Sequence, residues 1–380
     1  MCRWCDRLTK FARIARLLWD PGLNQAKRGV FLHMVGYCGL QSPVFVAPER
    51  DWDHDYSSAS VGTFLAMSDE ELATVDPLGV NLTVAKGIPS LGDLDIAGYQ
   101  RIVNEWTRDF AERCLPRWEP FYHESPQDFA NDIRFFRLGM LCQYLDLEVG
   151  IQYNLEQREV DRIHYTNPSD LFLNGVIDTR EGTCGNMAAL HRAMGWRLGW
   201  PVALACVGSH FVLRFDDGDT IYNIEATQAG YGGFKSDPDD YLIEQRKIPA
   251  IAVQCGSDLR ALRPREELGV FVGLRARHVR DVGLAEGSES TILASESDWL
   301  LARQLFPANR VLYRHQMLVT SMFGSQLFES HEAGHPNTYA GCLSEIAEFR
   351  GRTGAAGSQR AREVSPFAAD ELFFRMESNP

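Results

Sequence analysis

One stretch of about 45 residues constrains the fold of this chain most strongly, because a helix-like pattern is followed there by three strand-like runs. Gly182 breaks the preceding structure, and Thr183 is suited to cap the start of a helix. Gly199 and Pro201 supply the end of that helix. The apolar side chains that mark one face of it are Met187, Leu190, Met194 and Leu198. We therefore expect a single helix with an apolar face between these two breaks.

Cys184 falls in the first turn of the expected helix. The partial positive charge at a helix N-terminus favours a thiolate and lowers the pKa of a thiol placed there. A thiolate in that position is what a cysteine nucleophile requires. Taken alone the signal is weak, because a single cysteine near a helix start is more often a small packing residue. The interpretation of Cys184 depends on the residues that follow it.

Strand-like runs follow the helix at residues 202–207, 210–215 and 220–227. Asp217 and Gly218 are typical of a two-residue hairpin turn, because glycine tolerates the positive φ that such a turn requires. Counting outward from this turn places His210 directly opposite Glu225 on one sheet face. A carboxylate beside an imidazole fixes its tautomer and stabilises the imidazolium, which is the orienting half of a Cys–His–acid triad. The alternative is a purely structural His–Glu pair.

These residues resemble the transglutaminase-like superfamily, a branch of the papain-like cysteine enzymes. The stretches that carry the resemblance are GTC before a helix, GSHFVLRF at a strand and NIEAT on the next strand. The family order is a nucleophilic Cys, then a His, then an acid, which implies a triad of Cys184, His210 and Glu225. Many members carry Asp-Pro-Thr where this chain has Glu-Ala-Thr, and a bacterial subgroup with an IEAT-type motif uses Glu. The resemblance covers about residues 75–255.

The resemblance implies an α+β fold with a papain-like core, in which the helix bearing the cysteine packs on an antiparallel sheet between helical flanks. It also implies a cysteine-dependent amide hydrolase or acyltransferase that acts on a protein or peptide through a thioester on Cys184, with no metal or organic cofactor. The backbone N–H of Cys184 is one candidate oxyanion donor. No glutamine stands shortly before the cysteine, so Asn154 and Asn174 are the candidates for the second donor. Since the superfamily includes inactive relatives, a catalytically inactive binding module is the alternative.

A competing motif lies further along the chain. His331, Glu332 and His335 match the HExxH pattern, which in zinc peptidases places two His ligands and a Glu base on one helical face. Pro336 follows directly and disfavours helical geometry at His335, and Gly334 weakens the helix further. A zinc peptidase is therefore kept only as a second alternative.

Composition narrows the classes of function. The formal net charge is −13, from 38 basic and 51 acidic residues, which argues against a nucleic-acid-binding surface. No run of about 20 apolar residues is present, so we expect no membrane span. The nine cysteines follow no disulfide or zinc framework, which is typical of reduced thiols in a cytoplasmic protein. The oligomeric state is left open.

The patterns divide the chain into four parts. Residues 1–88 are a region of unclear fold, and residues 89–255 are the transglutaminase-like domain with its helical lead-in. Residues 256–320 are a helical segment, and residues 321–380 are a flexible tail. Residues 1–19 alternate basic and apolar side chains at helical spacing, which favours a helix packed on the protein over a membrane-surface helix. Ser125 and Pro126 are the expected N-cap and first position of another helix. Further helical spacing occurs at 99–110, 129–144, 268–279 and 292–306.

Overall fold

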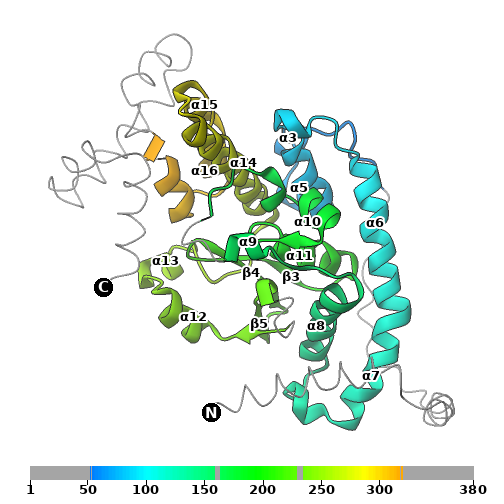
Figure 1. Cartoon of the computed structure of the whole chain (residues 1–380). Coiled ribbons are helices and arrows are strands. Elements are labelled where there is room, and N and C mark those ends of the chain that lie inside the picture. The colour runs from blue at the N-terminus through cyan, green and yellow to red at the C-terminus, as the bar shows by residue number, and fades with distance from the viewer. Residues whose placement is uncertain (1–51, 53, 159–162, 229–233, 317, 320–380) are drawn as a thin grey trace.

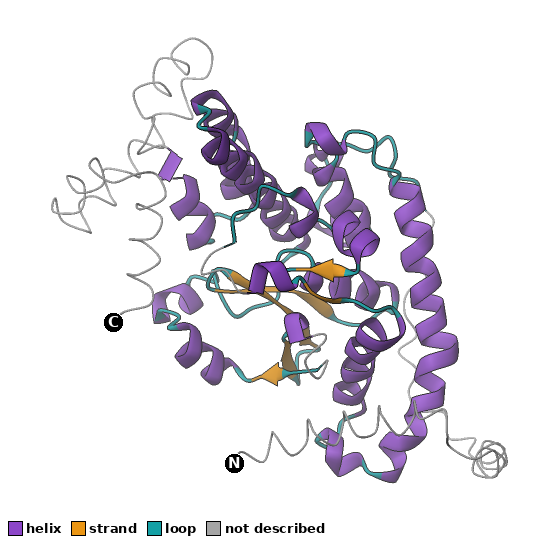
Figure 2. Cartoon of the chain, in the orientation of Figure 1, coloured by secondary structure: helices purple, strands orange, loops and turns teal. Residues whose placement is uncertain are grey.

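The computed structural model describes residues 52, 54–158, 163–228, 234–316, 318 and 319. These residues form an α+β fold in which a small sheet lies at the centre and helices surround it (Figure 1 and Figure 2). The predicted α+β class with an antiparallel sheet and helical flanks is therefore confirmed. The predictions for residues 1–19 and 321–380 lie outside the described residues.

The central sheet has four antiparallel strands in the order β3-β4-β5-β6. Strands β3 and β4 are joined by a tight turn and pair along their whole length, whereas β5 pairs with one half of β4. A separate two-stranded parallel pair, β1 and β2, leads directly into the turn that carries Cys184. The strands are β1 (Gln152–Tyr153), β2 (Glu181–Gly182), β3 (Val202–Val207), β4 (His210–Asp216), β5 (Ile221–Ile224) and β6 (Ser236–Asp237).

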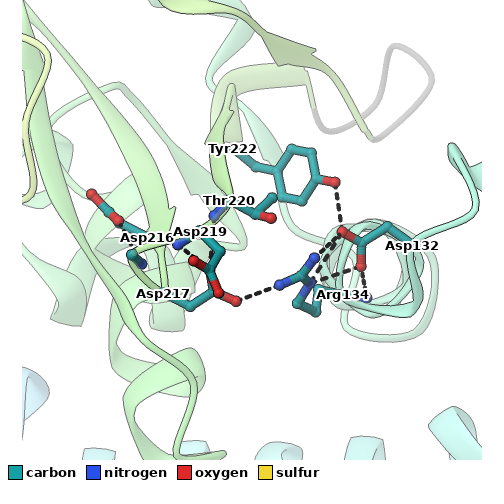
Figure 3. A network of polar contacts seen from close by, with 8 residues as sticks. Asp132, Arg134, Asp216, Asp217, Asp219, Thr220 and Tyr222 are labelled. Carbon is teal, nitrogen blue, oxygen red and sulfur yellow. Dashed lines mark hydrogen bonds and ion pairs between the residues drawn. The ribbon is translucent and has the colours of Figure 1, made fainter.

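The turn between β4 and β5 differs from the predicted two-residue hairpin. Asp216 pairs with Ile221, so four residues form the turn. The carboxylate of Asp217 accepts hydrogen bonds from the N–H groups of the two residues before β5, and its Oδ2 lies 2.5 Å from Arg134 Nη1 (Figure 3). Arg134 also binds Asp132. The side chain of Asp217 therefore closes a longer turn against the start of helix α8 (Ile133–Gln143).

The longer turn moves the register of the hairpin by two residues. The predicted two-residue turn would pair Phe215 with Thr220, but Phe215 pairs with Tyr222. Since side chains alternate between faces with a period of two, a slip of two leaves every residue on its predicted face. His210 and Glu225 are therefore not directly opposed in the ladder, and β5 ends at Ile224, yet they remain on the same face.

Helix α11 (Met187–Arg197) packs against this sheet, and every one of its residues is buried. A helix enclosed on all sides carries its charged residues only where each has a partner. Arg192 binds Glu267 at 2.9 Å, and Arg197 binds the fully buried carboxylate of Asp76. The Nε of Arg197 also donates to Asn104. These pairs connect the central helix to helices on both sides of it.

The helices that precede the sheet form one flank of the molecule. α6 continues through a π-helical turn, η2, into α7, and this column runs along one edge (Figure 1). The helical stripe predicted at 99–110 is confirmed there. The elements of this flank are α3 (Val61–Leu65), α4 (Asp69–Ala73), α5 (Pro77–Ala85), η1 (Pro89–Leu91), α6 (Ile96–Asp109), η2 (Phe110–Cys114), α7 (Leu115–Glu124), η3 (Pro126–Phe129), α8 (Ile133–Gln143) and η4 (Tyr144–Glu148).

The helix expected from Pro126 begins later than predicted. Pro126 opens only the short 3-10 turn η3, and the Ser125 side chain makes no capping hydrogen bond. Ala130 and Asn131 then adopt left-handed backbone angles, both with φ of 58°. Asp132 caps α8 instead, because its side chain accepts from the N–H of residue 134 at 2.8 Å.

Helices that follow the sheet form the opposite flank. α14 is the longest of them and packs against α15, α16 and the central α5. The helices predicted around 268–279 and 292–306 are confirmed, the second as two short helices that meet near Ser295. The remaining elements are α9 (Leu155–Arg158), η5 (Pro168–Asp170), α10 (Leu173–Thr179), η6 (Ala226–Gln228), α12 (Asp239–Arg246), α13 (Ala250–Gln254), α14 (Pro264–Glu286), α15 (Glu289–Ala294) and α16 (Glu296–Leu305).

A single large hydrophobic core extends from Tyr56 to Val319 and includes one face of the sheet. The other sheet face contributes to a smaller core with α12 and α13, through Ala205, Val207 and Val212. Both faces of the sheet are thus covered, and this packing holds the residues at the ends of its strands in place. No helix in the described part of the chain is long and apolar enough to cross a membrane.

Candidate active site

Cys184 lies in a tight turn that precedes α11, not inside the helix as predicted. Gly182 permits this turn, because a Cβ at that position would lie 2.6 Å from Met187 Cγ and 2.7 Å from Asn186 Oδ1. Both distances are shorter than real Cβ contacts, so a larger residue would push the turn away from the helix. The glycine therefore allows strand β2 to run directly against the start of α11.

The turn is closed by side chains that cap it from both ends. Thr183 Oγ1 accepts from the N–H of Gly185 at 3.1 Å, and Asn186 Oδ1 accepts from the N–H of Thr183 at 2.9 Å. Thr183 therefore closes the turn before α11, but the helix begins at Met187 with Asn186 as its N-cap, so the prediction of Thr183 as the helix N-cap is wrong. Within the described residues the N–H of Cys184 donates to no protein acceptor.

His210 is placed by the tight turn between β3 and β4. Gly208 has a φ of +66°, which the first position of such a two-residue turn favours and which glycine adopts without strain. Its N–H donates to the buried Asp258 carboxylate. Val207 and His210 form the last pair of the ladder. The imidazole therefore lies at the first residue of the inner strand β4, where its side chain is 12% exposed.

Glu225 follows the last residue of β5 and binds His210 directly. Its Oε2 lies 2.7 Å from Nε2 of the imidazole. Its Oε1 accepts from the N–H of Thr227 at 3.1 Å and from the hydroxyl of Thr227 at 2.6 Å. The N–H of Glu225 donates to the backbone oxygen of Lys235, so the next strand also holds the acid in place. The threonine of the NIEAT stretch thus fixes the carboxylate that orients the histidine.

The side chains of Cys184 and His210 lie close enough that each shifts the pKa of the other. Because Nε2 is engaged by Glu225, Nδ1 is the ring nitrogen left to face the sulfur. The structure therefore brings together all three residues that the sequence singled out. The mutual placement of Cys184 and His210 depends on the contact between the turn before α11 and the edge of the sheet.

Charges around the sulfur favour a thiolate–imidazolium pair. Burial alone would raise the pKa of Cys184, but the hydrogen bond and charge of His210 outweigh it and hold the pKa below its usual value. Burial lowers the pKa of His210, but the charge of Glu225 and the bonds to both partners raise it to about 9. Burial opposes ionisation of Glu225, yet His210 and Thr227 lower its pKa to about 2. Near neutral pH His210 and Glu225 are thus favoured in their charged forms, and the same charges shift the ionisation of Cys184 to lower pH.

The structure adds a residue that the sequence did not indicate. The hydroxyl of Tyr165 lies 3.7 Å from Cys184 Sγ. The guanidinium of Arg277, in α14, sits 4.6 Å from the centre of the Tyr165 ring. The positive charge of Arg277 also contributes to the lowered pKa of Cys184. No sequence motif marks either residue, because they come from a loop and from a helix far along the chain.

Two asparagines were expected as second oxyanion donors. Asn154 lies in the neighbourhood of the turn, since its backbone N–H donates to the oxygen of Gly182. Its side-chain Nδ2, however, donates to Asp170 Oδ1 at 3.1 Å. Asn174 is buried in α10, and its Oδ1 accepts no hydrogen bond from the described residues. Neither amide contacts the sulfur through a hydrogen bond in the described part of the structure.

The HExxH motif at His331, Glu332 and His335 lies outside the described residues. Among the residues that are described, no group of three or more His, Cys, Asp or Glu side chains is placed to hold a metal ion.

The fold and the site together define a class of protein: an α+β domain in which a cysteine before a central helix meets a His–Glu pair at the edge of an antiparallel sheet. Residues 130–254 match the family model described as the transglutaminase-like superfamily. This part of the chain therefore belongs to that superfamily, as the sequence resemblance suggested, and it includes all three site residues. No curated protein and no solved structure gave a significant match to the chain. Helix α14 lies beyond the matched segment.

Proposed function

We propose that this protein is a cysteine-dependent amide hydrolase or acyltransferase that forms a thioester on Cys184. The observation that carries the proposal is the 2.7 Å contact between the His210 ring and the Glu225 carboxylate, beside a cysteine whose pKa the same histidine lowers. The transglutaminase-like superfamily, to which residues 130–254 belong, is generally enzymatic. A site built only for stability would have no need of a partly buried thiol with a lowered pKa.

The roles of the residues follow from their contacts. The Cys184 thiolate attacks an amide carbonyl carbon, and the C–S bond forms as the carbonyl electrons move to oxygen. When this intermediate collapses, the C–N bond breaks and the His210 imidazolium protonates the departing amine. Glu225 keeps the ring oriented and stabilises its charge. Water or a second amine then attacks the thioester, which gives hydrolysis or acyl transfer.

A protein or peptide supplies the amide in this proposal. Of the described cysteines, all five are free, in keeping with a reducing compartment such as the cytoplasm. A nucleophilic thiol also requires reducing surroundings to remain active. We propose residues 89–255 as the transglutaminase-like domain with its helical lead-in.

Alkylation by iodoacetamide across a range of pH, read by peptide mapping, tests the proposal. Cys255 is exposed and serves as the internal reference in the same molecule. We expect Cys184 to react at close to its maximal rate near pH 7, where an ordinary thiol with a pKa of about 8.5 is mostly protonated. If Cys184 reacts no faster than Cys255 at that pH, the activated nucleophile does not exist and the proposal fails.

A further inference from the structure

The hydroxyl of Tyr165 is aimed at the sulfur of Cys184. The two atoms are 3.7 Å apart, and the tyrosine side chain belongs to a residue that is only 6% exposed. The tyrosine is therefore enclosed beside the turn that carries the cysteine, whereas Cys184 itself is partly exposed. A thiolate has no proton to give, so in the ionised site the hydroxyl is the donor of this hydrogen bond.

One face of α14 holds Tyr165 in this position by three separate contacts. Asp281 Oδ2 accepts from the N–H of Tyr165 at 3.1 Å. His278 Nδ1 lies 2.9 Å from the backbone oxygen of Tyr165. Arg277 covers the ring at 4.6 Å. Both backbone groups and the ring face are thus fixed by residues of one helical turn, so the direction of the hydroxyl is fixed as well.

The charged side chains around these contacts are themselves anchored. Asp281 binds Arg280 at 2.7 Å and lies 3.6 Å from Arg277 Nε. The side chain of Asp281 is fully buried. Breaking such a buried arrangement is costly, so α14 presents a rigid surface to Tyr165.

We propose that Tyr165 is a catalytic residue that donates a hydrogen bond to the oxyanion during acylation, and that α14 belongs to the active site because it positions this donor. The inference rests on the proposed function of Cys184. It assigns the second oxyanion donor beside the N–H of Cys184, which has no acceptor among the described residues. It also places part of the catalytic apparatus outside the segment that matches the superfamily.

The step needs no additional reactant. As the sulfur attacks, its negative charge passes to the carbonyl oxygen, which lies two bonds from the sulfur. The hydrogen bond of Tyr165 moves from sulfur to this oxygen, and the hydroxyl keeps its proton throughout. Burial and the neighbouring Cys184 raise the pKa of Tyr165 well above its usual value, so the donor stays protonated. The positive charge of Arg277 stands behind the ring and favours the same oxyanion.

Two reactions of the same sulfur separate this role from simple thiol activation. Alkylation by iodoacetamide displaces iodide and forms no oxyanion, whereas acylation by p-nitrophenyl acetate passes through one. Both are measured at a pH high enough that Cys184 is fully ionised in each protein. In Tyr165→Phe we expect acylation to fall by about 10²–10³-fold, as for the loss of one oxyanion donor, while alkylation changes little.

Tyr99→Phe is the matched control, because the Tyr99 hydroxyl on α6 also makes a side-chain hydrogen bond, at 2.7 Å to Asp178, but outside the site. It should leave both rates at the wild-type value. If Tyr165→Phe reduces acylation no more than alkylation, the oxyanion role is overturned while the nucleophile remains established. If wild-type Cys184 cannot be acylated at all, the proposed function fails and the inference falls with it.

A measurement on the unaltered protein guards against a misfolded variant. In a thionoester the developing charge resides on sulfur, which accepts hydrogen bonds poorly. For the wild-type protein we compare the rate of acylation by the thionoester with the rate by the matching ester. This ratio should be much lower than the ratio of the same two rates measured with a free thiol. Equal relative rates would mean that no donor acts on the oxyanion, which overturns the proposal without any substitution.

Discussion

Replacement of Glu225 by Gln tests how the His210 imidazolium is stabilised. The substitution keeps the size of the side chain and its ability to bond the ring, but it removes the charge. The Glu225 charge is the strongest influence that raises the pKa of His210, which reaches about 9 against an ordinary 6.5. That difference corresponds to about 3 kcal/mol. The two side chains are only 12% and 9% exposed, so solvent screens this interaction little.

Burial is already the largest influence on His210, and without the Glu225 charge less remains to oppose it, so the pKa of His210 falls. The thiolate of Cys184 then loses its counter-ion, and its own pKa rises. We expect the alkylation profile of Glu225→Gln to move to higher pH, with a rate at pH 7 that is lower by about 10²-fold. Peptide mapping of Cys184 after timed exposure to iodoacetamide gives this profile.

Glu119→Gln is the control for this experiment. Glu119 also binds a cation, Arg137, at 2.6 Å, but outside the site. Its alkylation profile should match that of the wild type. If the profile of Glu225→Gln also superimposes on the wild-type profile, the carboxylate does not stabilise the imidazolium and the electrostatic account of the triad is refuted.

Three further substitutions test the supports of the site. Thr227→Val removes a hydroxyl that bonds the Glu225 carboxylate, so the pKa of Glu225 should rise. As the pH is lowered, the rate of Cys184 alkylation should then begin to fall at a higher pH than in the wild type. An unchanged profile contradicts this role. Gly182→Ala places a methyl 2.6 Å from a side-chain atom and should lower the free energy of unfolding by about 1–3 kcal/mol in urea titrations, whereas a neutral result would mean that the turn relaxes freely. Asp76→Asn leaves a buried cation without its counter-charge, and its expected cost is about 3–5 kcal/mol by the same measurement; a loss below 1 kcal/mol would show that the pair is not closed to water.

The parts of the site that were predictable from sequence depend on local patterns. The Gly182-Thr183 stretch, the apolar helix after it and the strand runs define the order of elements without reference to distant residues. The His210–Glu225 contact was predicted from a turn of the wrong length. It survived because the error was two residues, which preserves the face of the sheet.

What could not be predicted depends on contacts between distant segments. The length of the β4–β5 turn is set by Arg134, which reaches Asp217 from 83 residues earlier in the chain. Tyr165 meets Asp281 across 116 residues. No local pattern encodes such a pairing, because it exists only once the C-terminal flank has packed on the core. The start of α8 was missed for a simpler reason: Asp132 caps the helix, and the serine ahead of it does not.

Trapping of an acyl-enzyme tests the central claim most directly. The protein is mixed with p-nitrophenyl acetate and quenched, and the adduct is located by peptide mass spectrometry, with Cys184→Ser as the control. We predict one acetyl group on Cys184 that appears faster than any on the exposed Cys255 and is removed by neutral hydroxylamine, as a thioester is. An acetyl group distributed among the cysteines according to their exposure, and unaffected by the loss of Cys184, would contradict the account.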